Sequence, residues 1–149
     1  MLHWRMRFTL TTRATPDQVR EALTDFSERR LETWSQTLDP TTYDARVVGD
    51  TWAVAKESTP RSPYWVVCRY DWSDPDVVRW TMTETSWGGG GSGSVWIEPA
   101  GEGSRLDVEW TYTGKTSFRD RLLLPLIQAW PMNRVIAGMW TKALDRFAG

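Results

Sequence analysis

The sequence has almost no cysteine or histidine, with one of each, Cys68 and His3, in 149 residues. A lone cysteine excludes a disulfide within the chain, and a lone histidine excludes metal sites built from several imidazoles. Cys68 falls in an expected strand, where a small buried side chain is the simplest interpretation. His3 falls on the polar side of the first expected strand, as surface histidines usually do. We therefore expect neither a metal nor a cofactor.

An excess of charge of one sign is also lacking. The 18 basic and 19 acidic side chains give a net charge of −1, and they form no basic block of the kind that binds nucleic acid. No apolar run reaches the length of about 18 residues that suggests a membrane helix, and the first residues show no apolar signal segment. We expect a soluble, cytoplasmic protein with no nucleic-acid partner and no membrane span. The sequence leaves its oligomeric state open.

Tryptophan, by contrast, is abundant, with 11 residues. Most of these indoles fall in expected strands or in the last expected helix, so they either fill a large core or line a pocket. The chain is long enough to bury such a core, and it shows neither an internal repeat nor a second domain. Residues 1–149 are therefore expected to form a single domain.

The segment from Thr116 to Ala148 predicts the longest helix. Apolar residues recur in it mostly at the three- and four-residue spacing of an amphipathic helix, with charged residues between them. Pro125 and Pro131 interrupt the pattern, and a proline inside a helix removes a backbone donor and kinks the axis. We expect a short first piece, a kink and a long final piece.

The rest of the chain predicts strands, apart from two short helices near its start. Leu2–Thr12 alternates between apolar and polar residues, as a half-buried strand does. Thr15-Pro16-Asp17-Gln18 then predicts a capping box with proline at the first helical position, and a second short helix is expected from Ser27 to about Thr33. The strands expected after these helices are Tyr43–Val48, Thr51–Glu57, Tyr64–Trp72, Val77–Trp87, Ser94–Glu98 and Arg105–Thr113.

Two features of this region stay open. The strand Tyr64–Trp72 can present either of two sets to the core, namely Trp65, Val67 and Arg69, or Val66, Cys68 and Tyr70. Gly88–Gly93 is expected to connect two strands, either as a plain flexible turn or as a lid at the mouth of a pocket. It lacks the Lys-Ser/Thr and the following helix of a phosphate loop, so we expect no phosphate there.

A meandering antiparallel sheet with one apolar face must be covered, and the terminal helix is the available cover. This arrangement resembles the START-like superfamily, in the polyketide cyclase/dehydrase and lipid-transport branch often called SRPBCC. The matching features are the opening strand into Thr15-Pro16-Asp17-Gln18-Val19, the helix that ends near Trp34, the segment Val48-Gly49-Asp50-Thr51-Trp52 and the amphipathic tail. The resemblance implies an α+β helix-grip fold, with a curved seven-stranded antiparallel sheet around the C-terminal helix. It also implies a deep, mostly apolar cavity for a lipid, a polyketide or an aromatic metabolite.

The candidate ligand-binding residues are those expected to point into this cavity: Trp34, Trp52, Arg69, Trp80, Met82, Trp96, Trp110, Trp130 and Trp140. Each tryptophan also has a simpler interpretation as core filling. Arg69 belongs to the set only if Trp65, Val67 and Arg69 are the residues of their strand that face the core. Trp96 belongs to it only if Val95 and Ile97 do not face the core instead.

Glu84 and Tyr112 are the candidate catalytic residues. Each follows apolar residues at two-residue spacing, so each is expected on the apolar face of its strand. A carboxylate in an apolar wall has its pKa raised by desolvation, as a general acid or base requires, and a tyrosine there can hydrogen-bond a ligand carbonyl. Glu84 also lies near a strand end, where it has the alternative interpretation of a solvated residue.

Three functions remain. Binding of a hydrophobic small molecule is favoured because it needs only the cavity. The first alternative is a cyclase- or dehydratase-like tailoring enzyme that uses Glu84 and Tyr112 for proton transfer. The second is a protein-interaction module whose exposed aromatic residues, such as Trp4 or Trp87, dock a partner. The sequence identifies neither the ligand nor a reaction.

Overall fold

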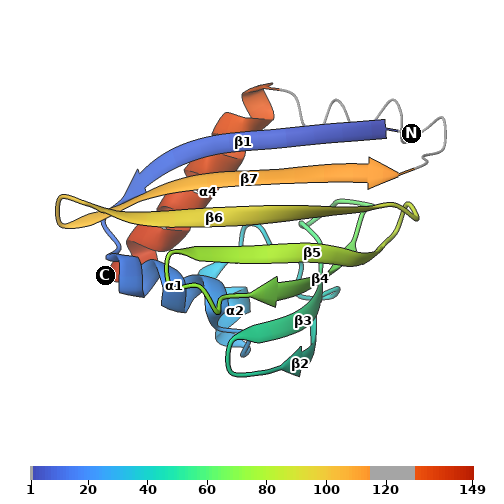
Figure 1. Ribbon diagram of the computed structural model, residues 1–149, viewed down its shortest axis with the longest axis horizontal. Coiled ribbons are helices and arrows are strands. Elements are labelled where there is room, and N and C mark those ends of the chain that lie inside the picture. Colours follow the sequence, from blue (N-terminus) through green and yellow to red (C-terminus); the bar gives the residue numbers. More distant parts are fainter. Residues whose placement is uncertain (1, 115–129) are drawn as a thin grey trace.

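Figure 1 shows the computed structural model, which describes residues 2–114 and 130–149, with the side chains of residues 5–114 and 133–149. Its elements in chain order are β1 (Leu2–Thr12), α1 (Pro16–Thr24), α2 (Arg29–Thr33), β2 (Asp44–Val48), β3 (Trp52–Glu57), β4 (Val66–Asp71), β5 (Val77–Thr85), β6 (Gly90–Ala100), β7 (Gly103–Gly114) and α4 (Trp130–Ala148).

The strands form one 7-stranded sheet in the order β1-β7-β6-β5-β4-β3-β2. All neighbouring strands are antiparallel; each strand from β2 to β6 pairs with the next one along the chain, and β7 pairs back with β1. The sheet curves, and α4 crosses behind β1 and β7 in the view of Figure 1. The expected α+β helix-grip fold is therefore confirmed.

The short helices α1 and α2 are joined through Trp34. Helix α1 starts with the predicted capping box, in which the Thr15 hydroxyl accepts from the Gln18 amide and the Gln18 side chain accepts from the Thr15 amide. Helix α2 ends at Trp34, whose indole Nε1 donates to the Ala22 carbonyl at 3.0 Å. This buried hydrogen bond fixes the indole against α1, on the side of the molecule where α4 lies.

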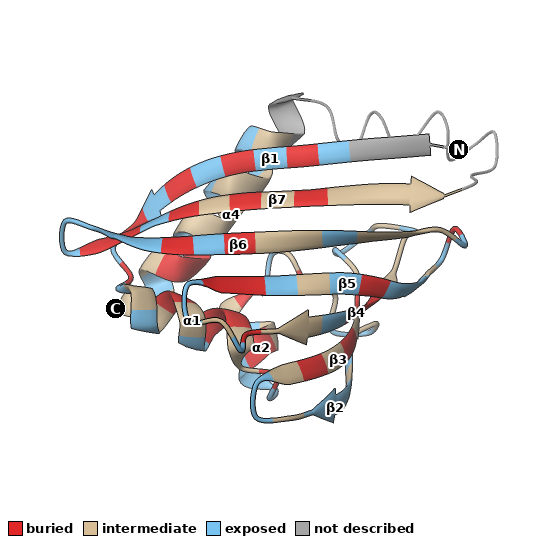
Figure 2. Ribbon diagram, in the orientation of Figure 1, coloured by how far each residue is buried: buried red, intermediate tan, exposed pale blue. Residues whose placement is uncertain are grey.

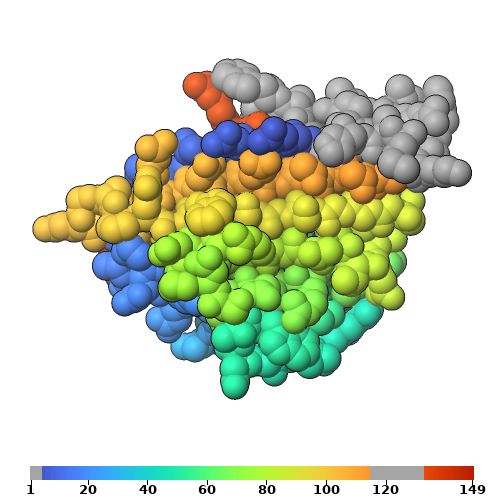
Figure 3. All heavy atoms as spheres, viewed as in Figure 1, coloured from blue at the N-terminus to red at the C-terminus, as the bar shows by residue number. Residues whose placement is uncertain are grey.

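The core lies between the concave face of the sheet and the helices. Along β1 the buried side chains of Met6, Phe8 and Leu10 alternate with exposed ones, and Figure 2 shows this alternation as bands on the strand. Helix α4 packs against β1 and contributes the fully buried Leu144. In the space-filling view of Figure 3, the outer face of the sheet hides nearly all of α4.

The open question about β4 is answered in favour of Val66, Cys68 and Tyr70, which face the concave side. Arg69 points to the opposite face, where its guanidinium lies 5.1 Å from the centre of the Trp52 ring. Cys68 is a buried free thiol, as expected.

Strand β5 contains a bulge that the sequence pattern hides. Cys68 pairs with Met82 but Val67 pairs with Glu84, so Thr83 is an extra residue in β5. A bulge of this kind interrupts the alternation of side chains between the two faces. Beyond it Glu84 points outward, although Trp80 and Met82 point inward.

The glycine-rich segment belongs largely to a strand and not to a loop. Strand β6 begins at Gly90, and the turn before it occupies residues 86–89. A Cβ on Gly93 would lie 2.2 Å from Cζ2 of Trp80, and one on Gly91 would lie 2.1 Å from the Thr111 carbonyl oxygen. Glycine is needed at these two positions because neighbouring atoms occupy the space of a side chain.

Helix α4 is the long final piece expected from the sequence, with Pro131 at its second residue. Proline suits the first turn of a helix because the amides there have no partner within the helix. The expected short first piece lies outside the described residues, and the sequence left the position of the kink open. Within the described part of the chain, no helix has the length and apolar character needed to cross a membrane.

Candidate ligand-binding cavity

A cavity of about 290 Å³ lies between the concave face of the sheet, α2 and α4. The strands contribute alternate inward-facing residues, and α4 closes the opposite side with Ile136, Met139 and Trp140. Loop residues around Thr37 and Ser58 complete the wall. Helix α4 therefore forms one wall of the cavity and also covers the core.

Eight aromatic rings line the cavity, beside aliphatic, sulfur-containing and polar side chains. The indoles of Trp34 and Trp140 lie 5.0 Å apart, and those of Trp80 and Trp110 lie 6.4 Å apart, as measured between ring centres. The Tyr70 ring continues this surface 6.1 Å from Trp80. Ring pairs at such separations attract each other. The cavity thus has aromatic, apolar surfaces that are tilted against one another.

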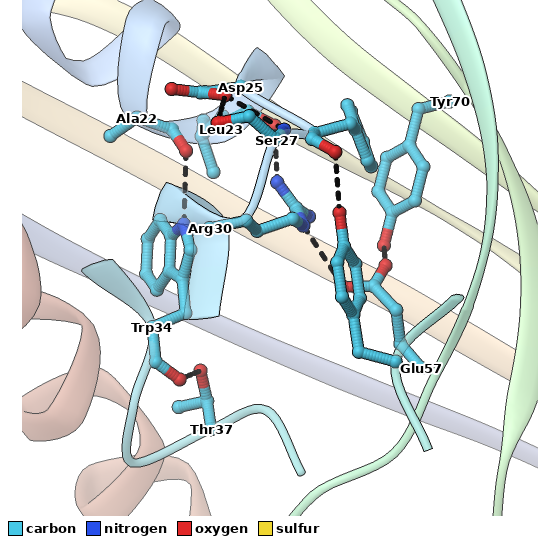
Figure 4. A network of polar contacts seen from close by, with 11 residues as sticks. Ala22, Leu23, Asp25, Ser27, Arg30, Trp34, Thr37, Glu57 and Tyr70 are labelled. Atoms are coloured by element: carbon cyan, nitrogen blue, oxygen red, sulfur yellow. Dashed lines mark hydrogen bonds and ion pairs between the residues drawn. The ribbon is translucent and has the colours of Figure 1, made fainter. Parts of the chain in front are cut away.

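A buried ion pair lies in the same wall. Arg30 of α2 donates from Nε to Glu57 Oε2 of β3 at 3.1 Å, and each of the two side chains is only 7% exposed. Nη1 of Arg30 also donates to the Leu23 carbonyl at 2.9 Å. The Tyr70 hydroxyl donates to the other carboxylate oxygen of Glu57. Figure 4 shows Arg30 and Tyr70 converging on Glu57 from two elements.

Arg30 remains a cation, and Tyr70 remains a neutral donor. Burial lowers the pKa of Arg30, but the Glu57 carboxylate and the Tyr70 hydroxyl outweigh that effect and raise it. Burial, followed by the nearby Glu57 carboxylate, raises the pKa of Tyr70 well above its ordinary value. At neutral pH Arg30 is therefore a cation and Tyr70 a neutral phenol, and both donate to Glu57.

A second polar group lies further along the wall, around Tyr112 of β7. Its ring lies 5.5 Å from the Trp87 ring, and both residues line the cavity with Cys68. Burial and the nearby Cys68 raise the pKa of Tyr112 above its ordinary value. Tyr112 therefore contributes a neutral hydroxyl to the residues that line the cavity at pH 7.

The structure brings six of the residues proposed from sequence to the cavity wall: Trp34, Trp80, Met82, Trp110, Tyr112 and Trp140. It leaves four of them on the outer face or outside the wall: Trp52, Arg69, Glu84 and Trp96. The side chain of Trp130 lies outside the described residues.

Each of these four departures has a physical cause. The bulge at Thr83 turns Glu84 outward, where it pairs with Arg46 at 3.0 Å and is 57% exposed. Strand β6 sends Val95 and Ile97 inward, so Trp96 is exposed and lies against Arg79. Trp52 and Arg69 pack on each other on the outer face. Arg69 lies there because Val66, Cys68 and Tyr70 are the residues of β4 that face inward.

Sequence reasoning missed Arg30, Glu57 and Trp87 as wall residues and left Tyr70 open. Glu57 follows two buried alanines in alternation, and that phase was the signal that it faces inward. An arginine on a five-residue helix gave no comparable signal. Trp87 was expected to be exposed, but it is only 9% exposed and packs on Tyr64 and Tyr112. The docking surface proposed for Trp87 is therefore wrong.

Solved structures with this architecture come from bacteria and plants. TTHA0849 from Thermus thermophilus superposes with a TM-score of 0.76 at 17% identity, with 97% of each chain covered. The Zhui aromatase/cyclase from Streptomyces sp. R1128 gives 0.73 at 16% identity, covering 97% of this chain and 95% of that one. Norcoclaurine synthase from Thalictrum flavum gives 0.68 at 13% identity, covering 97% and 86%.

These identities show a shared fold and do not identify a shared activity. No curated protein matches the chain in sequence. The family described as polyketide cyclase / dehydrase and lipid transport matches residues 3–149, nearly the whole sequence. The chain therefore belongs to the polyketide cyclase / dehydrase and lipid transport family.

Proposed function

We propose that this protein binds a flat, largely apolar small molecule in the cavity between the sheet and α4, and that it does so as a single cytoplasmic domain. The observation that carries the proposal is a cavity of about 290 Å³ whose wall is largely apolar and includes eight indole and phenol rings. Ligand pockets in proteins are typically apolar and aromatic, with a few fixed polar groups, and this wall has that composition.

The size of the cavity narrows the class of ligand. An apolar cavity of about 150 Å³ accommodates a benzene molecule. A space of about 290 Å³ therefore suits two fused rings or a chain of similar bulk. The aromatic rings in its wall favour a ligand with a flat face, because such a face can lie against an indole or phenol ring.

Filling the cavity from within tests the proposal. Val66 of β4 lines the cavity and is half-buried, so the side chain of Val66→Trp would occupy ligand space. Val48 of the edge strand β2 is 57% exposed, and Val48→Trp makes the same change on the surface. The neutral dye N-phenyl-1-naphthylamine, followed by its fluorescence, should bind Val66→Trp at least about tenfold more weakly than it binds wild type and Val48→Trp. Equal binding by all three proteins would refute the proposal.

A second candidate is a cyclase- or dehydratase-like enzyme. The observation that favours it is Glu57, a carboxylate in the cavity wall with the hydroxyls of Tyr70 and Tyr112 in the same wall. A carboxylate and neutral phenols are suitable groups for moving protons on a bound carbonyl compound. Mass spectrometry of the molecule that co-purifies with the protein distinguishes the two candidates. An enzyme releases a dehydrated or cyclised product, and Glu57→Gln stops that conversion, whereas a carrier releases its ligand unchanged.

A further inference from the structure

We infer that the Arg30–Glu57 pair makes the cavity selective for uncharged ligands that place an oxygen acceptor beside Arg30. This inference rests on the proposed binding function and adds a charge rule to it. Carboxylates such as free fatty acids, and organic ammonium ions, would be rejected, whereas ketones, quinones and phenols of similar shape would be accepted.

The charged groups of the cavity wall form one closed pair. Among the described residues that line the cavity, Arg30 and Glu57 are the only charged side chains. They form a direct ion pair in which each side chain is 7% exposed. The wall is therefore electrically balanced before a ligand enters, and little solvent is available to screen an added charge.

A second charge at this place would have no partner. A ligand carboxylate near Arg30 would also lie close to Glu57, so repulsion offsets the attraction while the loss of its hydration remains. A ligand ammonium ion near Glu57 faces the same difficulty with Arg30. A neutral oxygen loses much less hydration on entry, and it can still accept a hydrogen bond from the guanidinium.

Arg30 has a donor left over for such an oxygen. Its Nε donates to Glu57 and its Nη1 to the Leu23 carbonyl. Among the described residues, no acceptor takes a hydrogen bond from Nη2. This nitrogen is also not one of the fully buried polar atoms without a partner, so part of its surface is accessible. Since Arg30 lines the cavity, its Nη2 is the donor that a ligand oxygen can reach.

The orientation of the guanidinium is fixed before a ligand arrives. Its carbon lies 4.1 Å from the centre of the Phe26 ring and 5.3 Å from that of the Tyr70 ring. Cation–π contacts of this kind hold the plane of the group, and the two hydrogen bonds hold its rotation within that plane. The donor therefore has a defined position, and a ligand pays little ordering entropy to meet it.

Three two-ring probes that differ only in their substituent test the rule: 2-acetylnaphthalene, 2-methylnaphthalene and 2-naphthoate. Quenching of the tryptophan fluorescence at about pH 7.5 measures their binding. The ketone should bind more tightly than the hydrocarbon, and the carboxylate should bind at least about tenfold more weakly than the ketone.

The decisive variant is Glu57→Gln, which keeps the shape of the side chain and leaves Arg30 with an uncompensated positive charge. It should reverse the preference, so that 2-naphthoate binds at least about as tightly as the ketone. Glu84→Gln removes a carboxylate of the same type from its pair with Arg46 on the outer face, and it should keep the wild-type order. Circular dichroism confirms that each variant is folded before the titrations.

Each result has a separate meaning. A wild-type protein that binds all three probes with equal affinity, or binds the carboxylate best, overturns the charge rule but leaves the binding function intact. If Glu57→Gln is folded and keeps the wild-type order, Glu57 does not set the preference and the inference is wrong. If none of the three probes binds to wild type, the proposed function fails, and the charge rule fails with it.

Discussion

The contact between Gly93 and Trp80 gives a direct test of how the cavity wall is built. A Cβ at residue 93 would lie 2.2 Å from Cζ2 and 2.3 Å from Cε2 of that indole, whereas carbon atoms in contact are about 3.5–4.0 Å apart. Gly93→Ala therefore forces the indole to withdraw by more than about 1 Å. Because Trp80 lines the cavity, part of this movement takes space from a ligand.

The cost of Gly93→Ala follows from two opposing effects. Overpacking a core typically destabilises a protein by about 1–3 kcal/mol. Replacing glycine with alanine restricts the unfolded chain and returns about 0.4–1 kcal/mol. We expect the free energy of unfolding to fall by about 1–2 kcal/mol, which lowers Tm by about 3–6 °C in a chain of this size. Thermal unfolding followed by circular dichroism measures this change.

Gly90→Ala is the matched control in the same strand. The nearest atom to a Cβ there is the Met82 carbonyl oxygen at 3.6 Å, an ordinary contact. Its unfolding free energy should stay within about 0.5 kcal/mol of the wild-type value. N-phenyl-1-naphthylamine should bind normally to Gly90→Ala and more weakly to Gly93→Ala. If the two variants behave alike in both assays, Gly93 does not position the Trp80 indole and our account of the wall is wrong.

Two further predictions concern titratable groups. Burial raises the pKa of Asp145, but hydrogen bonds from the Thr12 hydroxyl (2.6 Å) and the Arg13 amide (2.9 Å), with the Arg13 charge, hold it below its usual range. A depressed folded-state pKa contributes stability above the unfolded value of about 3.9, and this stability is lost as the pH falls through the folded value. Asp145→Asn should therefore lower the unfolding free energy by about 1–2 kcal/mol at pH 7 and much less near pH 3, and a gap in Tm that does not narrow with acid would contradict this. Burial, with the nearby Glu57 carboxylate, raises the pKa of the Cys68 thiol, so a disulfide reagent such as 5,5′-dithiobis(2-nitrobenzoate) should react with it on the order of a hundredfold more slowly than after unfolding in urea. Similar rates in the two states would show that the thiol is accessible.

The fold was predictable because its signals are local. The alternation in Leu2–Thr12, the capping box at Thr15 and the amphipathic pattern before Ala148 each follow from the geometry of one element. The sheet order then follows from hairpins and the need to cover one apolar face. These local rules do not depend on which residues meet across the molecule.

The cavity was only partly predictable, for two physical reasons. Trp80, Met82 and Trp110 were found because their strands alternate regularly where they lie. Glu84 was misplaced because a bulge cannot be read from hydrophobic periodicity. The Arg30–Glu57 pair was missed because it joins a short helix to a strand 27 residues away, and no local pattern encodes such a contact.

The bulge at Thr83 also affects how the charge of the cavity can change. The residues on either side of it belong to opposite faces of the sheet only because the chain carries one extra residue there. Insertion of one residue between Val67 and Cys68 in a related chain would give Thr83 a partner, restore regular alternation in β5 and turn the carboxylate of Glu84 from water toward the ligand. Members of this family can thus acquire a second acidic group in the binding site without any substitution in β5, so alignments that treat gaps in β4 as neutral would overlook a change in ligand preference.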